Sequence, residues 1–206
     1  MKPVCLVLGA GAGIGGTVAT KFAQEGYHSS LCRRSDKKGL DRLVNNIKDQ
    51  GGSANGYIMN AIEDNAIEEV ITSIESDIGP IEVLVYNLGA QTGMKLLEQT
   101  SHKEFEWGWR MASFGLFRAA KILCPLMVER GKGTFLVTSA TAAMRGNRNQ
   151  HSHAAAMAAR RMLCQSLNAE FSPQGIHITH IVVDGAVDAP DTLGKMMGPE
   201  MYQKFR

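Results

Sequence analysis

The sequence has few of the features that mark membrane, metal-binding or nucleic-acid-binding proteins. Its four cysteines lie far apart without a Cys-x-x-Cys pair, which argues against a metal site or a redox dithiol and favours reduced, mostly buried thiols. No apolar stretch approaches the roughly 18 residues of a spanning helix. The net charge is only +2, with acids and bases interspersed, so nothing in the charge balance points to nucleic acid or a membrane.

No linker or internal repeat divides the chain. We therefore expect its 206 residues to form one α/β domain, residues 1–206, with a sizeable core. Met1, Lys2 and Pro3 lead directly into an apolar run, from which we expect no signal peptide and a cytoplasmic location.

Short apolar runs alternate with helical patterns along the chain. This alternation predicts a single Rossmann-type, doubly wound parallel sheet with helices on both faces, and ligands at the carboxyl ends of its strands. The expected strands are residues 4–8, 28–32, 54–59, 81–86, 134–138 and 176–183, and the expected helices are 14–27, 38–50, 63–78, 105–129 and 154–171.

A glycine-rich turn joins the first strand to the first helix. Glycine lets the backbone turn sharply and approach a pyrophosphate, which then lies on the free N–H groups at the helix N-terminus. The alternative is a tight strand-to-helix turn without a ligand. The residues predicted to bind a dinucleotide here are Gly9, Gly11, Gly13, Ile14 and Gly15.

Arg33 and Arg34 end the second predicted strand. An enzyme that uses NAD would have an acidic residue here for the ribose hydroxyls, whereas guanidinium groups suit a 2′-phosphate. The predicted cofactor is therefore NADP(H). A pair of solvated arginines is the alternative.

Two further motifs follow predicted strands: Tyr86-Asn87-Leu88-Gly89 after the fourth and Asp184-Gly185-Ala186-Val187 after the sixth. Together with the glycine turn they make the chain resemble the short-chain dehydrogenase/reductase family, whose motifs here are TGxxxGIG, NNAG and a PG turn. The resemblance covers nearly the whole chain. It implies a small carbonyl or alcohol substrate, and it adds five residues to the expected cofactor site: Asn60, Asn87, Gly89, Gly185 and Val187.

The resemblance also locates the four catalytic positions of the family, and the chain differs at each one. Ala112 stands at the family's asparagine, Ala140 at its serine, His153 at its tyrosine and Met157 at its lysine. At the serine position a shift of one residue would instead place Ser139 there. In the family the tyrosine is the acid/base, and the lysine lowers the tyrosine pKa and holds the nicotinamide ribose. No Tyr-x-x-x-Lys occurs anywhere in this chain.

Two hypotheses follow for function. Imidazole, with an ordinary pKa of about 6.5, is a competent proton donor near neutrality. His153 as the acid and Ser139 as the substrate anchor would make an NADP(H)-dependent oxidoreductase of altered mechanism. The alternative is a catalytically silent NADP(H)-binding pseudoenzyme, in which His153 has no catalytic role.

The polar residues also suggest two other functional interpretations, which have less support in the sequence. Ser139, His153 and Asp184 suggest a hydrolase triad, but the Gly-x-Ser-x-Gly elbow that presents such a serine is missing from the sequence. The segment 145–153, dense in Arg, Asn and His, either recognises a polar or anionic substrate or is a solvated loop.

The C-terminal segment and one helix face supply the last predictions. By the resemblance, residues 186–206 begin a substrate lid, with a mobile part at 191–198. The sequence stops before the family's seventh strand, so we expect either a shortened sheet or a further C-terminal tail. Family members commonly pair helices between subunits, and small side chains permit close approach. We expect a homodimer or homotetramer that uses Ala154, Ala155, Ala158, Ala159 and Met162; packing within the monomer is the alternative.

Overall fold

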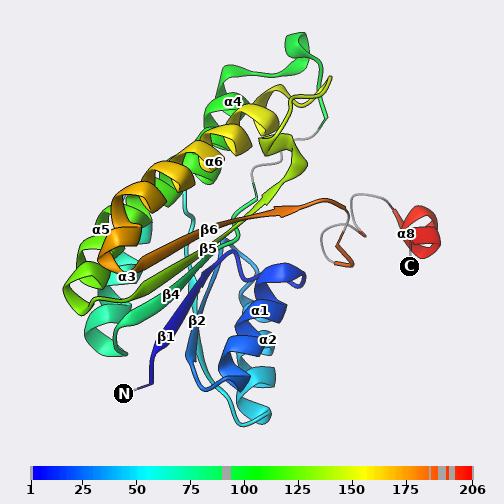
Figure 1. The fold of residues 1–206 in the computed structure, drawn as a ribbon. Helices are drawn as coiled ribbons and strands as arrows, with labels where there is room; N and C mark the ends of the chain where they lie inside the picture. Colours follow the sequence, from blue (N-terminus) through cyan, green and yellow to red (C-terminus); the bar gives the residue numbers. More distant parts are fainter. Residues whose placement is uncertain (1, 90–93, 186, 190–193, 195–197, 206) are drawn as a thin grey trace.

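The structure is a computed structural model that describes residues 2–89, 94–185, 187–189, 194 and 198–205. It confirms the predicted α/β class, with one parallel sheet and helices on both faces (Figure 1). The strand order is β3-β2-β1-β4-β5-β6. The order reverses between β1 and β4, which is where open α/β sheets bind ligands.

All six predicted strands form. Their bounds differ from the predicted ones by two residues at most: β1 (Val4–Leu8), β2 (His28–Arg33), β3 (Ser53–Ile58), β4 (Ile81–Tyr86), β5 (Gly133–Ala140) and β6 (Ile176–Val183). Side chains of β1 alternate between the two faces of the sheet, so that Leu6 packs in one core and Val7 in the other. In the described part of the chain the sheet ends at β6, where Ile181 and Val182 are exposed.

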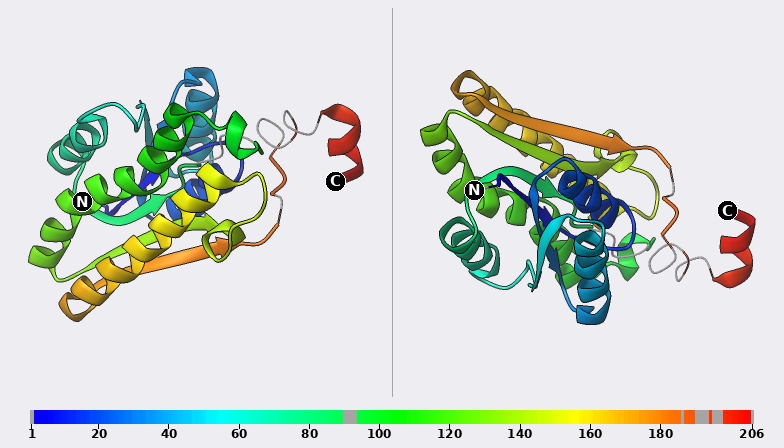
Figure 2. Two further views of the ribbon diagram at one scale, coloured as in Figure 1. Left: turned by 90° about the horizontal axis from the view of Figure 1, so that it is seen from above. Right: turned by 90° about the horizontal axis from the view of Figure 1, so that it is seen from below.

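Helices α1 (Ile14–Gln24) and α2 (Lys37–Asp49) cover one face of the sheet. Helices α3 (Ala66–Asp77), α5 (Gly115–Arg130) and α6 (His151–Phe171) cover the other (Figure 2). A short helix α8 (Pro199–Phe205) stands away from the sheet in each view. The expected mobile segment 191–198 lies mostly outside the described residues.

The predicted helix at 105–129 is longer and less regular than expected. Helix α4 (His102–Trp109) follows its N-cap residue Ser101, whose side chain forms a capping box with Glu104. A π-helical segment, η2 (Arg110–Phe114), then joins α4 to α5. Such π segments often occur at functional sites.

The continuous helix from His102 to Arg130 corrects one sequence expectation. Its 29 residues, with a mean hydropathy of 1.5 in the most apolar window, suffice by length and composition to cross a membrane. That window is 61% buried, and α5 packs against α3 and the sheet. A core helix passes the same test, so the feature is weak evidence for a membrane span.

The four cysteines are free and buried, as predicted. Burial raises the pKa of the Cys5 thiol to about 12 and that of Cys164 to about 11. Thiols in this state are packing residues rather than nucleophiles.

Candidate functional site

The glycine turn is a tight connection between β1 and α1. Gly9 has a φ of +95°, and a Cβ atom on it would lie 2.5 Å from the carbonyl oxygen of Asn87. A Cβ atom on Gly15 would lie 2.2 Å from the carbonyl oxygen of Gly9. Side chains are therefore excluded at both positions. Within the described residues, no side-chain hydrogen bond caps α1 at Gly13, so the N-terminus of this helix can receive an anion.

Asn87 ties this turn to the rest of the sheet. Its Nδ2 donates to the carbonyl of Gly9 at 2.9 Å, and its Oδ1 accepts from the Thr138 hydroxyl at 2.8 Å. Its backbone N–H donates to the carbonyl of Leu8. We call the residues Gly9, Gly15, Asn87 and Thr138 the Asn87 network. It joins the carboxyl ends of β1, β4 and β5 at the point where the strand order reverses.

Arg33 and Arg34 differ in how they are held. The Arg33 Nε donates to the carbonyl of Ala10 in the glycine turn at 2.6 Å, and its Nη1 donates to Asp36 at 2.7 Å. Asp36 also caps α2 by accepting from the backbone N–H of Gly39. Arg34 is exposed. The end of β2 thus presents one oriented guanidinium and one solvated guanidinium.

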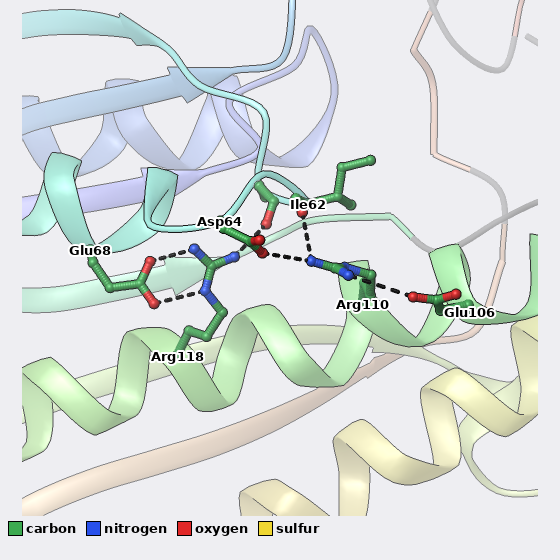
Figure 3. Close-up of polar contacts among 7 residues, drawn as sticks. Ile62, Asp64, Glu68, Glu106, Arg110 and Arg118 are labelled. Atoms are coloured by element: carbon green, nitrogen blue, oxygen red, sulfur yellow. Dashed lines mark hydrogen bonds and ion pairs between the residues drawn. The ribbon is translucent and has the colours of Figure 1, made fainter. Parts of the chain in front are cut away.

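Asn60 lies just after β3 in a loop that two arginines hold in place. Its Nδ2 donates to Glu63, while its buried Oδ1 has no hydrogen-bond partner among the described residues. Arg110 donates to the carbonyl of Ile62 and to Asp64, as Figure 3 shows. The loop therefore holds an acceptor oxygen that has no partner among the described residues.

Arg118 holds the other end of the same loop. Its guanidinium donates to the carbonyl of Ala61 at 3.0 Å and pairs with Glu68 (Figure 3). Burial raises the pKa of the Glu68 carboxyl, but the bonds from Arg118 outweigh it and the net pKa is lowered. Sequence reasoning missed both Arg110 and Arg118, because an arginine in a helical pattern has no signal that distinguishes a bound guanidinium from a solvated one.

The segment after β6 approaches the glycine turn. A Cβ atom on Gly13 would lie 3.2 Å from the Cβ of Ala189 and 3.9 Å from the Cγ1 of Val187. Ala189 is buried, and sequence reasoning did not single it out. Gly185 is exposed after β6, and Gly89 leads into residues outside the described part of the chain.

These observations fit a dinucleotide. The open N-terminus of α1 suits a pyrophosphate, Arg33 and Arg34 suit a 2′-phosphate, and the unpartnered Oδ1 of Asn60 suits a hydrogen-bond donor such as an adenine amino group. Elsewhere in the described ranges, no group of three or more His, Cys, Asp or Glu side chains could hold a metal ion.

The four positions that correspond to the family's catalytic residues lie at the end of β5, in η2 and on α6. Three of them, Ala112, Ala140 and Met157, pack in one apolar cluster. We call it the alanine cluster; its members are Ala112, Ala140, Ala142, Ala143, Ala154, Ala156 and Met157. His153 is buried one turn before Met157 on the same face of α6. The structure thus brings the predicted positions together in apolar surroundings.

Ser139, the predicted substrate anchor, is buried beside this cluster. Its hydroxyl is directed at the Met157 sulfur, 3.7 Å away. Asp184, considered as a triad member, is exposed after β6. The polar segment before α6 is also exposed at 145–148, whereas Asn149 accepts a hydrogen bond through its carbonyl from the backbone N–H of Lys95.

An apolar pocket of about 390 Å³ lies between η2, α5 and α6. Phe117, which lines the pocket, and Met162 on α6 are about half exposed, with exposed fractions of 46% and 49%. Ala155 and Ala158 on α6 are exposed, while Ala154 and Ala159 are half-buried. The pocket lining consists of Trp109, Ser113, Phe114, Phe117, Ala159 and Leu163.

The sequence is similar to those of known dehydrogenases and reductases. The family model described as short chain dehydrogenase matches residues 3–194. The 3-oxoacyl-[acyl-carrier-protein] reductase FabG of Thermotoga maritima is 28% identical over 189 residues, which cover 92% of this chain and 76% of FabG. The 2,3-dihydro-2,3-dihydroxybenzoate dehydrogenase of Bacillus subtilis is 27% identical, over 90% of this chain and 70% of its own length.

Two solved structures also resemble this chain in fold. A short-chain dehydrogenase from Rhodopseudomonas palustris superposes with a TM-score of 0.80 at 28% identity, covering 88% of this chain and 84% of its own. A short-chain dehydrogenase from Sphingobium yanoikuyae, solved in complex with NADPH, has a TM-score of 0.83 at 25% identity. The superposition covers 93% of this chain and 75% of the Sphingobium yanoikuyae chain.

Proposed function

Because the chain belongs to the short-chain dehydrogenase family, we propose that it is an NADP(H)-dependent oxidoreductase of altered mechanism that acts on a small carbonyl or alcohol. The observation that carries the proposal is the Asn87 network beside the open N-terminus of α1. Its bonds keep the glycine turn in one geometry before any ligand arrives. A preformed site loses less conformational entropy on binding than a mobile one.

The preference for NADP(H) over NAD(H) is argued from the end of β2. The bonds to the Ala10 carbonyl and to Asp36 hold the Arg33 guanidinium beside the glycine turn. Arg34 adds a second positive charge. Asp36 accepts from Arg33 and from the backbone N–H of Gly39, so its carboxylate is engaged away from a ribose hydroxyl. The NADPH complex of the Sphingobium yanoikuyae relative supports the same choice.

The proposed chemistry places the proton donor at His153. When bound, NADP(H) supplies or accepts the hydride. His153 is buried one turn before Met157 on the same face of α6, beside the alanine cluster. The alanine cluster beside His153 is apolar, and apolar surroundings strengthen a hydrogen bond made there. General acid catalysis of this kind contributes about 10²–10⁴-fold.

A second function is supported by the alanine cluster itself. Ala112, Ala140 and Met157 offer no hydrogen bond to a substrate, and the Ser139 hydroxyl is directed at the Met157 sulfur. On this second proposal, the protein binds NADP(H) without turning over a substrate. Fold alone does not separate the two functions, because one fold supports both.

Assembly and location complete the proposal. The exposed alanines of α6, the neighbouring Met162 and the apolar pocket beside α5 form a face suited to a second copy of the chain. We expect a homodimer or homotetramer built across this face. Four free buried thiols fit a reducing compartment, and the cytoplasm is the location we propose.

One set of measurements tests the function. Calorimetric titration with NADPH and with NADH measures binding, and NADPH oxidation across a panel of small ketones and aldehydes measures turnover. Binding with turnover supports the oxidoreductase. Binding without turnover on any carbonyl supports the silent protein, and absence of binding by either cofactor overturns both.

A further inference from the structure

Arg160 is a buried guanidinium that joins three separate segments. It lies on α6 and is only 1% exposed. Its Nη2 donates to the carbonyl of Leu88 at 2.7 Å, its Nε to that of Ala112 at 2.9 Å and its Nη1 to that of Thr138 at 2.6 Å. These carbonyls follow β4, lie in η2 and lie in β5. One side chain therefore fixes the spacing of all three.

In the described part of the chain, neutral groups stabilise the positive charge of Arg160. Besides the three carbonyls, the guanidinium lies 5.2 Å from the centroid of the Tyr86 ring. A buried cation requires such partners, because burial without them is costly. A planar guanidinium reaches three diverging carbonyls at once, whereas a lysine ammonium acts as a compact point charge. The site is therefore built for arginine.

These bonds connect Arg160 to the glycine turn. Thr138, whose carbonyl accepts from Arg160, donates its hydroxyl to Asn87, and Asn87 donates to the carbonyl of Gly9. Leu88, the second acceptor, is the residue after Asn87. The third acceptor, Ala112, is a member of the alanine cluster. Arg160 is thus the side chain that joins the Asn87 network to the alanine cluster.

We infer that Arg160 is a positioning residue for the nicotinamide half of the cofactor site, an inference that rests on the proposed binding of NADP(H). The strand order places its contacts on β4 and β5, on one side of the glycine turn. Arg33, proposed to bind the 2′-phosphate, ends β2 and Asn60 follows β3, on the other side of the glycine turn. Loss of Arg160 should therefore disturb one half of the site and leave the other in place.

The competing role for Arg160 is a general brace of the core. A brace stabilises the whole domain, so its removal would weaken every ligand together. Two ligands separate the roles: NADPH occupies both halves, whereas adenosine 2′,5′-bisphosphate has the adenine and the 2′-phosphate without the nicotinamide. The ratio of their affinities reports on the nicotinamide half alone.

The experiment measures both affinities by calorimetry for the native protein, Arg160→Met, Arg160→Lys and the control Arg161→Met. Arg161 is the next residue on α6 and is half-buried. We expect Arg160→Met to weaken NADPH by about 10-fold or more, while adenosine 2′,5′-bisphosphate changes less than about twofold. Arg160→Lys should lie between, because it keeps the charge but loses the fork. Arg161→Met should match the native protein.

Each other outcome overturns the inference. An unchanged NADPH affinity in Arg160→Met, or an equal loss for both ligands accompanied by a lower melting temperature, makes Arg160 a core brace. If Arg160→Met does not fold, the same two titrations on Arg160→Lys decide. A native protein that binds neither ligand overturns the proposed function as well, whereas native binding with unaffected variants overturns the inference alone.

Discussion

The Asn87 network and the alanine cluster lie at the same edge of the sheet and differ in how their polar groups are used. In β5, Thr138 donates its hydroxyl to Asn87, and two residues later Ala140 packs against Ala112 and Met157. The first region is a set of directed bonds between backbone and side chain. The second is close packing of small apolar groups. A site that binds a dinucleotide and a site that acts on it are therefore separate requirements on this fold, and a chain can meet one without the other.

The strongest way to break this comparison is to remove the glycine turn. Gly15→Ala places a Cβ atom 2.2 Å from a backbone carbonyl, so the turn must move. We expect NADPH affinity to fall by about 100-fold or more, measured by calorimetry. Gly146→Ala is the control, since a Cβ atom there also meets nothing within 4 Å and Gly146 lies outside the glycine turn. Equal affinities in the two variants would show that the turn does not hold the cofactor.

The alanine cluster is tested from two directions. If His153 is the acid, His153→Ala should reduce the rate of carbonyl reduction by roughly 10²-fold. If the cluster is silent, Ala112→Asn, Ala140→Ser, His153→Tyr and Met157→Lys together should create activity that the native protein lacks. NADPH oxidation assays measure both.

The control for these variants is cofactor binding. His153→Ala should leave NADPH affinity nearly unchanged, because the Asn87 network does not include His153. Native activity that survives His153→Ala in full would contradict the assigned acid. A fourfold variant without activity would contradict the idea that these side chains are what the site lacks.

Much of this organisation could be predicted from the sequence because it depends on local patterns. Apolar runs marked β1, β4 and β6 with their observed bounds, and the glycine spacing marked the turn. The helix predicted from residue 63 begins at Ala66 in the structure, because Asn65 before it has a φ of 62°. The apolar periodicity of a sequence does not predict a helix boundary that depends on one residue's backbone conformation.

The bonds of the arginines could not be predicted in the same way. Arg160 donates only to backbone carbonyls, and every residue type has one, so Leu88, Ala112 and Thr138 carry no signal for it. Its position next to Arg161 in a helical pattern gives no indication of which of the two is buried. Ser139 was predicted from its neighbours in a motif, whereas the direction of its hydroxyl depends on Met157, 18 residues later.

A smaller effect is expected at the end of β2, where the two arginines differ. Arg33 is oriented by Ala10 and Asp36, whereas Arg34 is exposed. Charge-assisted hydrogen bonds contribute about 1.5–3 kcal/mol. We expect Arg33→Ala to reduce the preference for NADPH over NADH by about 10- to 100-fold, and Arg34→Ala by less.

Titrations of both cofactors check this prediction, with Arg42→Ala on the exposed side of α2 as the control. A double variant, Arg33→Ala with Arg34→Ala, should lose the preference. If it keeps the full preference for NADPH, the 2′-phosphate is not bound at the end of β2.

The smallest effect concerns the polar contacts that lead into the alanine cluster. The Lys95 ammonium, followed by the backbone and side chain of Ser101, lowers the pKa of the Glu104 carboxyl to about 2. The backbone carbonyl of Glu104 accepts from the Ser152 hydroxyl, so the start of α4 is bonded to the residue beside His153. Since the folded pKa of Glu104 is below its ordinary value near 4.5, its contribution to the stability of the fold is present above that value and is lost as pH falls towards 2.

We expect amide hydrogen exchange around residues 101–104 and 152–153 to speed up between about pH 5 and pH 2, while exchange in the glycine turn changes less. Glu104→Gln is the control, because it should show the faster exchange already at neutral pH and lose the pH dependence. An equal pH response in both regions would mean that global acid unfolding, and not this ion pair, sets the exchange near His153.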